Sequence, residues 1–178
     1  IQEKVLDNNR DINVDNDFWW DYDTKAVMDA EEDGFKVKDF NFDLFSKGGG
    51  ARINIEGVDP KIVKNIYKSG TPEYRKIKKL MRDGYLRIWQ EDTRWATHYQ
   101  HSNTFTLDWD VVDIDITPET EKTVEDFTRK VDGLLKVRSN QLYTELREQY
   151  VYLTSDEAIR ETLDANEYEF KKDGTIFR

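Results

Sequence analysis

Residues 118–149 read PETEKTVEDFTRKVDGLLKVRSNQLYTELREQ, and this stretch decides the fold. Pro118 suits the first position of a helix, where a missing N–H leaves no intrahelical bond unmade. The apolar residues then recur at helical spacing, which predicts one stripe buried against the rest of the molecule. Its members are Val124, Phe127, Val131, Leu134, Leu135, Leu142 and Leu146. The sequence therefore predicts a long helix in the C-terminal half of the chain, ending near residue 149.

A β-hairpin is predicted on the N-terminal side of this helix. Residues 35–45 alternate apolar and polar side chains with one change of phase, which indicates a strand with a bulge. Gly48 to Gly50 predict a turn, and residues 51–56 return as a second strand.

Further strands are predicted at residues 85–90 and 94–116. The second of these changes phase after Val111, so we expect another bulge or bend there, with the strand continuing to Ile116.

Shorter helices are predicted at residues 2–9, 16–32, 60–69 and 72–83. The segment Thr154-Ser-Asp-Glu157 is typical of a capping box, with Thr154 as N-cap of a last helix that ends near Asp164. A small hairpin around Asp173-Gly174 closes the chain. The expected fold is α+β in a single domain, residues 1–178, with an antiparallel sheet of about five or six strands covered mainly on one face by helices.

The composition favours a folded protein of a reducing compartment. Of the 178 residues 37% are hydrophobic, and five Trp, nine Tyr and nine Phe supply a core despite 36% charged residues. The absence of cysteine excludes disulfides, thiol nucleophiles and cysteine-ligated zinc. No apolar run reaches the length of a membrane span, so we expect a cytoplasmic protein without a membrane partner. Because the chain begins at Ile1 and not at Met, we also expect a few residues upstream.

The net charge of −10 is distributed unevenly along the chain. Residues 7–33 hold ten acidic residues against Arg10 and Lys25, and residues 108–126 hold eight against Lys122. Residues 61–87 are basic, with nine Lys or Arg against two acidic residues. Such a dipolar molecule attracts charged partners, whereas its total charge disfavours direct binding to nucleic acid.

Three stretches carry a resemblance to a known family: residues 2–20, residues 42–51 and residues 150–177. Together they resemble a family of small phage and prophage accessory proteins, some of which are labelled as the antitoxin of a toxin–antitoxin stability system. Family members usually carry an acidic residue between two glycines in the second stretch, where this chain has Lys47 followed by Gly48, Gly49 and Gly50. The resemblance implies a phage-encoded accessory protein.

Two acidic fragments are similar to known sites. Asp11, Asp15 and Asp17 have the spacing of the first half of a calcium-binding loop, but the glycine and the final glutamate of such a loop are missing. Asp113 and Asp115 after an apolar run are similar to the nucleophile strand of haloacid-dehalogenase-like phosphatases, but the parallel α/β sheet that this chemistry needs does not follow. We therefore predict no metal and no catalytic residue here.

The two histidines and the glycine run are also weighed as sites. His98 and His101 lie three residues apart without a third ligand nearby, which favours a structural role. Gly48 to Gly50 are not followed by the lysine and hydroxyl of a nucleotide-binding P-loop, so a hairpin turn explains them. The sequence thus predicts no cofactor.

The acidic and aromatic segment after the first predicted helix is the predicted partner-binding site. Its residues, called the N-terminal strip below, are Asp11, Asp15, Asp17, Trp19, Trp20, Asp21 and Asp23. Carboxylates steer a basic partner, and aromatic rings are favoured at interface centres.

Three hypotheses follow for the function. The first is a non-enzymatic phage protein that binds and inhibits a host macromolecule, such as a nucleic-acid enzyme of host defence, by imitating duplex phosphates as anti-CRISPR-like inhibitors do. The second is an antitoxin-like protein that neutralises a partner toxin. The third and weakest is a small metal-dependent nuclease or phosphatase that uses the Asp and His fragments.

Overall fold

The computed structural model describes residues 2–14, 24–93, 96 and 99–177, and the contacts among them divide the chain into two compact units. Unit 1 contains the residues up to 22 and those from 145 to the end. Unit 2 contains residues 23–144.

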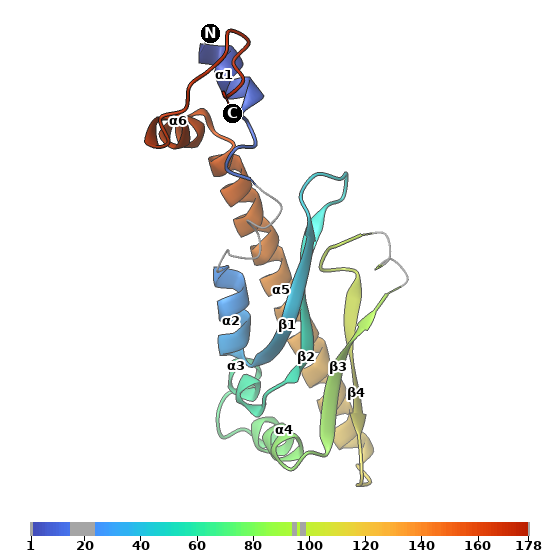
Figure 1. The fold of residues 1–178 in the computed structure, drawn as a ribbon. Helices are drawn as coiled ribbons and strands as arrows, with labels where there is room; N and C mark the ends of the chain where they lie inside the picture. Colours follow the sequence, from blue (N-terminus) through green and yellow to red (C-terminus); the bar gives the residue numbers. More distant parts are fainter. Residues whose placement is uncertain (1, 15–23, 94–95, 97–98, 178) are drawn as a thin grey trace. The chain divides into compact units, whose positions relative to one another are not determined.

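Two antiparallel hairpins form the β-structure of unit 2 (Figure 1). The first pairs β1 (Phe35–Asp43) with β2 (Gly50–Val58), and the second pairs β3 (Leu86–Asp92) with β4 (Phe105–Val111). The mixed α and β composition is confirmed. The prediction of one sheet with five or six strands is wrong for the described residues, because they form two separate sheets of two strands each.

A side chain separates the two sheets. The carboxamide of Gln90 on β3 accepts from the backbone N–H of Ile55 at 2.8 Å and donates to the carbonyl of Ile53 at 3.2 Å. An amide side chain carries both a donor and an acceptor, so it bonds the edge of β2 as a neighbouring strand would. The backbone of β3 is thereby held away from β2, and the ladder ends between the two hairpins.

Within unit 2 the long helix α5 (Pro118–Leu153) runs behind both hairpins (Figure 1). Its side chains accept hydrogen bonds from two further backbone N–H groups of the strands. Ser139 Oγ accepts from the N–H of Ile53 at 3.0 Å, and Asp132 Oδ1 accepts from the N–H of Leu107 at 3.0 Å. Ser139 is fully buried. These polar residues of the helix satisfy strand edges that would otherwise require another strand.

The apolar stripe predicted for α5 is confirmed, except that Leu134 is only half-buried. The largest fully buried side chains of unit 2 are Ile53, Ile62, Val63, Ile77, Phe105, Val124, Phe127, Val131, Leu135 and Leu142.

The helix α2 (Lys25–Asp33) begins at its N-cap Thr24 and ends at Gly34, which adopts a φ of 119°. It corresponds to the second half of the helix predicted at 16–32, whose first half lies outside the described residues. Arg138 of α5 donates to Asp33 Oδ2 at 2.7 Å, and this contact raises the pKa of the guanidinium. The ion pair joins α2 to α5.

The predicted helices between the hairpins are confirmed with shorter bounds: a 3₁₀ turn η1 (Pro60–Ile62), α3 (Val63–Ile66) and α4 (Pro72–Arg82). Asp59 and Thr71 cap η1 and α4 through their side chains, as the Asp-Pro and Thr-Pro pairs indicate.

The bulge predicted in the first strand is confirmed, since the register shifts between Lys36 and Asp39. The predicted continuation of the last strand to Ile116 is wrong. Val112 bonds to the carbonyl of Tyr85 beyond the start of β3, and Asp113 then takes a positive φ of 62°, which turns the chain away. Residues 112–117 therefore form a loop.

Unit 1 combines α1 (Gln2–Asn8), the last turns of α5, α6 (Asp156–Ala165) and the C-terminal turn. The predicted terminal hairpin is reduced to one bridge between Phe170 and Ile176. The small core of unit 1 consists of Leu6, Ile159 and Leu163, with Val5, Ile12, Phe170 and Ile176 packed against them.

The N-cap of α6 differs from the prediction by one residue. Ser155 Oγ, not Thr154, accepts from the N–H of Ala158 at 3.2 Å. The hydroxyl of Thr154 instead donates to the carbonyl of Tyr150 at 2.9 Å and so belongs to the end of α5. A capping box requires an extended N-cap residue, and here the preceding helix still includes residues up to Leu153.

Candidate functional site

Exposed carboxylates follow one another along the end of β4, the next loop and the start of α5. We call them the acidic segment: Asp108, Asp110, Asp113, Asp115, Glu119, Glu121 and Glu125. Among the described residues only Glu119 of this segment forms an ion pair, with Lys76 Nζ at 3.4 Å. Asp108 and Asp110 lie on the outer face of β4, about 6.8 Å apart along the strand. The other six carboxylates are exposed and form no ion pair with a described residue.

Asp126, the eighth acidic residue of this stretch, has a structural role instead. Its carboxylate binds Lys130 and Arg129 and accepts from the hydroxyl of Tyr67 at 2.9 Å. These bonds, that to Lys130 first, lower the pKa of Asp126 to about 2. Burial and the same carboxylate raise the pKa of Tyr67, whose ring stacks on Phe127 at 6.0 Å. The cluster fixes the residue after α3 to the first half of α5.

A basic helix lies beside the acidic segment. The exposed cations of α4 are Arg75, Lys78, Lys79 and Arg82. Lys76 of the same helix reaches Glu119, so the two charged surfaces meet at this ion pair. Unit 2 therefore carries opposite charges on adjacent elements.

The N-terminal strip is described only in part. Asp11 lies exposed in the turn after α1. The other six residues, Asp15, Asp17, Trp19, Trp20, Asp21 and Asp23, lie outside the described residues, so the strip stays a prediction. Near Asp11, Arg10 binds Asp7 at 2.9 Å and Asp156 at 2.5 Å, which ties α1 to α6 within unit 1.

The remaining fragments form no metal-binding group in the part of the chain that is described. Asp113 and Asp115 point from a loop, and there is no set of three His, Cys, Asp or Glu placed to hold a metal ion. His101 Nδ1 accepts from the N–H of Asn103 at 2.9 Å, a local turn contact, and His98 lies outside the described residues.

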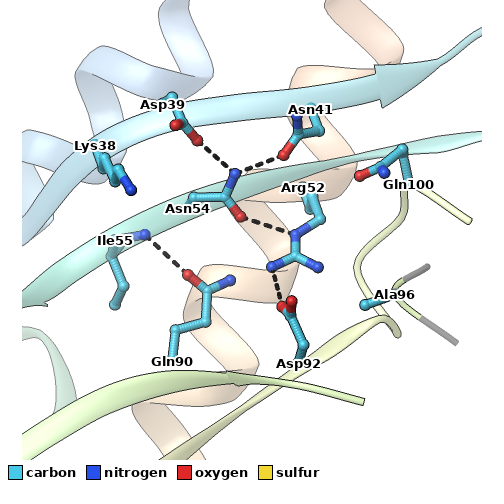
Figure 2. Close-up of a pocket in the computed structure, with 10 residues that line it drawn as sticks. All are labelled: Lys38, Asp39, Asn41, Arg52, Asn54, Ile55, Gln90, Asp92, Ala96 and Gln100. Atoms are coloured by element: carbon cyan, nitrogen blue, oxygen red, sulfur yellow. Dashed lines mark hydrogen bonds and ion pairs between the residues drawn. The ribbon is translucent and has the colours of Figure 1, made fainter. Parts of the chain in front are cut away.

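A polar pocket that the sequence did not reveal lies between the first hairpin and β3 (Figure 2). Its volume is about 490 Å³, and its lining residues are Lys38, Asp39, Asn41, Arg52, Asn54, Ile55, Gln90, Asp92, Ala96 and Gln100. The register of the hairpin could have indicated it, because Asp39 faces Asn54 and Asn41 faces Arg52 across the strands.

A hydrogen-bond network fixes the floor of the pocket. Asn54 donates to Asp39 Oδ1 at 2.5 Å and to Asn41 Oδ1 at 2.7 Å, and it accepts from Arg52 Nε at 2.8 Å (Figure 2). Arg52 also donates to Asp92 Oδ1 at 2.6 Å. The guanidinium lies 5.7 Å from the ring centre of Phe105. The side chain of Arg52 is 9% exposed, whereas that of its partner Asp92 is 65% exposed.

A family model matches residues 37–156, and its description is Domain of unknown function (DUF8835). The chain belongs to the DUF8835 family. No curated protein and no solved structure matches the chain. The DUF8835 match has no link to phage proteins or antitoxins, so that resemblance stays a prediction. Among the described residues, no helix is long and apolar enough to cross a membrane.

The region of the DUF8835 match includes the polar pocket and the whole acidic segment, whereas the N-terminal strip and most of α6 lie outside it. The two candidate sites of unit 2 therefore lie in the part of the chain that defines the family.

Proposed function

We propose that the protein is a non-enzymatic, phage-encoded binding protein that inhibits a host nucleic-acid enzyme by presenting carboxylates to the basic site that receives phosphates. One observation carries the proposal. Six exposed carboxylates of the acidic segment, all but Glu119, have no ion-pair partner among the described residues.

The arrangement of these carboxylates suits a partner of opposite charge. Four of them belong to β4 and α5, and Asp113 and Asp115 belong to the short loop that joins these two elements. The buried stripe of α5 and the Asp126 cluster hold the helix in place, so the charges of β4 and α5 have a defined spacing. A field of one sign on a rigid surface accelerates association with a basic partner and excludes acidic ones. Glu119 and Glu121 also stabilise the first turn of α5 through its dipole, which accounts for only two of the seven.

The alternative partner is a toxin. A toxin that acts on nucleic acid has the same kind of basic site, so an antitoxin would use the same surface. The identity of the captured partner distinguishes the two functions.

The test begins with capture of partners from host lysate treated with nuclease, followed by release with duplex DNA. A partner that occupies a phosphate-binding site is expected to be displaced by the DNA, because both ligands then compete for one site. A partner that binds equally well in saturating DNA contradicts mimicry of nucleic acid.

Charge variants then locate the surface on the captured partner. The acidic-segment variant carries Asp113→Asn, Asp115→Asn and Glu121→Gln. The matched control also removes three negative charges, on and just after α6, by Glu161→Gln, Asp164→Asn and Glu167→Gln. We expect the first to slow association about tenfold at low salt and to flatten its salt dependence, and the control to do neither.

A third variant, with Asp11→Asn, Asp21→Asn and Asp23→Asn, tests the N-terminal strip in the same assay. If the association rate is slowed only by this variant, the strip is the binding surface. If none of the three variants changes the rate or its salt dependence, inhibition by charge mimicry is wrong.

A further inference from the structure

The polar pocket has donors and acceptors that the fold does not use. Three N–H groups of Arg52 are engaged by Asn54, Thr104 and Asp92, and its other two form no hydrogen bond with a described residue. Asp39 and Asp92 each use one carboxylate oxygen in the network, and the second oxygen of each is unused among the described residues. Lys38 lines the pocket from β1 and forms no ion pair within the described part of the chain.

The hydrogen bonds on the floor of the pocket hold its polar side chains in place before a ligand binds. Burying a guanidinium is unfavourable unless its hydrogen bonds are satisfied, and Arg52 achieves this with partners from three different segments. Asn54 is saturated by Arg52, Asp39 and Asn41, so its side chain has one orientation. A site whose groups are held in place before a ligand arrives loses little entropy on binding.

The charge and surface of the pocket restrict the ligand. Among the described lining residues two cations, Lys38 and Arg52, balance two anions, Asp39 and Asp92, which disfavours a ligand of high net charge. Among the described residues, the lining includes no aromatic ring, and its apolar members are Ile55 and Ala96, so these residues offer no platform for a stacked base or a large apolar group. The other lining residues are amides, which both donate and accept.

We propose that this pocket binds a small uncharged polyhydroxylated molecule, that is, a sugar or the ribose of a nucleoside. A hydroxyl donates and accepts at once, so adjacent hydroxyls match neighbouring carboxylate and amide groups. The volume of about 490 Å³ is within the usual size of small-molecule pockets of about 300 to 1,000 Å³. The proposal is independent of the acidic segment and goes beyond the proposed function.

The experiment uses the whole chain labelled with ¹⁵N and follows the side-chain amide signals of Asn41, Asn54, Gln90 and Gln100. The probes are maltose, for free sugars, uridine, for nucleosides, and 1,6-hexanediol as a control that has hydroxyls without the dense polar surface. We expect maltose or uridine to shift these signals in a saturable manner with a dissociation constant of about 1 mM or tighter, and hexanediol not to. Saturation by maltose would identify a free sugar as the ligand class, and saturation by uridine would identify a nucleoside.

Variants connect the signals to the pocket. Lys38→Ala and Gln100→Ala are expected to weaken binding at least about fivefold, since each removes a donor from the lining. The matched control is Lys36→Ala, because Lys36 is also an exposed lysine of β1 but does not line the pocket.

The proposal is overturned if neither maltose nor uridine gives saturable shifts, if hexanediol gives the same shifts, or if Lys36→Ala weakens binding as much as Lys38→Ala. Lys38→Ala should leave association with the captured partner unchanged, so a failure of this proposal is distinguishable from a failure of the proposed function.

Discussion

Replacing Gly50 by alanine should force the first hairpin away from residues 100–101, which form one wall of the polar pocket. Gly50 begins β2 and pairs with Asp43. A Cβ at Gly50 would lie 2.3 Å from His101 Cβ, 3.1 Å from His101 Cα and 3.2 Å from the carbonyl oxygen of Gln100. Carbon atoms in good contact are about 3.5 to 4.0 Å apart, so the segment would have to move by more than about 1 Å.

The magnitude follows from which atoms are displaced. Two of the three neighbouring atoms, His101 Cα and Gln100 O, belong to the backbone, so rotation of a side chain cannot relieve the overlap. Overpacking a well-packed contact costs about 1 to 3 kcal/mol. Replacing glycine also reduces the conformational entropy of the unfolded chain, which stabilises the folded protein by about 0.4 to 1 kcal/mol. We therefore expect Gly50→Ala to lower the free energy of unfolding by about 0 to 2.6 kcal/mol, and by about 1 to 3 kcal/mol relative to a glycine replacement that meets no overlap.

Urea unfolding of Gly50→Ala and Gly57→Ala measures this effect with a matched control. Gly57 lies in the same strand, has no heavy atom within 4 Å of the added Cβ, and is not at positive φ. Its substitution should leave the free energy of unfolding unchanged or raise it by up to about 1 kcal/mol. Equal stability of the two variants would refute the close packing of residues 100–101 against β2, and with it one wall of the pocket.

Two further predictions concern a cap and a titrating group. Ser155→Ala should lower the free energy of unfolding of unit 1 by about 1 kcal/mol, because the N–H of Ala158 loses its acceptor. Thr154→Ala should have a smaller effect, since this hydroxyl does not cap α6. Urea unfolding followed by signals of α6 compares the two variants, and a larger effect of Thr154→Ala would contradict the assignment of Ser155 as N-cap. Asp126 has its pKa lowered from 3.8 to about 2, so its contribution is present above pH 3.8 and lost as the pH falls through 2. Thermal midpoints of Asp126→Asn should therefore fall less than those of the unsubstituted protein over this range, and parallel curves would show that Lys130 gives no net stabilisation.

The elements with strong local signals were predictable from the sequence. The long helix, its buried stripe, the first hairpin with its bulge and the Asp-Pro and Thr-Pro helix starts all depend on spacing or on turn residues close in sequence. The separation of the strands into two sheets was not predictable, since it depends on Gln90 reaching β2 and on Ser139 reaching the same strand from α5. Neither contact can be recognised from the pattern of apolar and polar residues.

The polar pocket was hidden for the same physical reason. Alternation in a strand distinguishes a buried face from a polar one, but it does not distinguish solvent from a cavity. Asp39, Arg52 and Gln90 come from three strands, and only the register and the gap between the hairpins bring them together. The acidic segment, in contrast, was visible as charge in the sequence, and the structure adds that its side chains are exposed.

The acidic segment also has a consequence for stability that separates function from folding. Like charges held close together repel one another, and six of these carboxylates form no ion pair with a described residue. Asn replaces Asp113 without backbone strain, because both residues tolerate the left-handed φ of 62° found there. If the charges serve only the fold, the acidic-segment variant should be less stable than the unsubstituted protein. If they serve a partner, the variant with Asp113→Asn and Asp115→Asn alone, which keeps the helix-capping charge of Glu121, should melt at a higher temperature while it associates more slowly, since removal of the repulsion stabilises the fold and removes the attraction together.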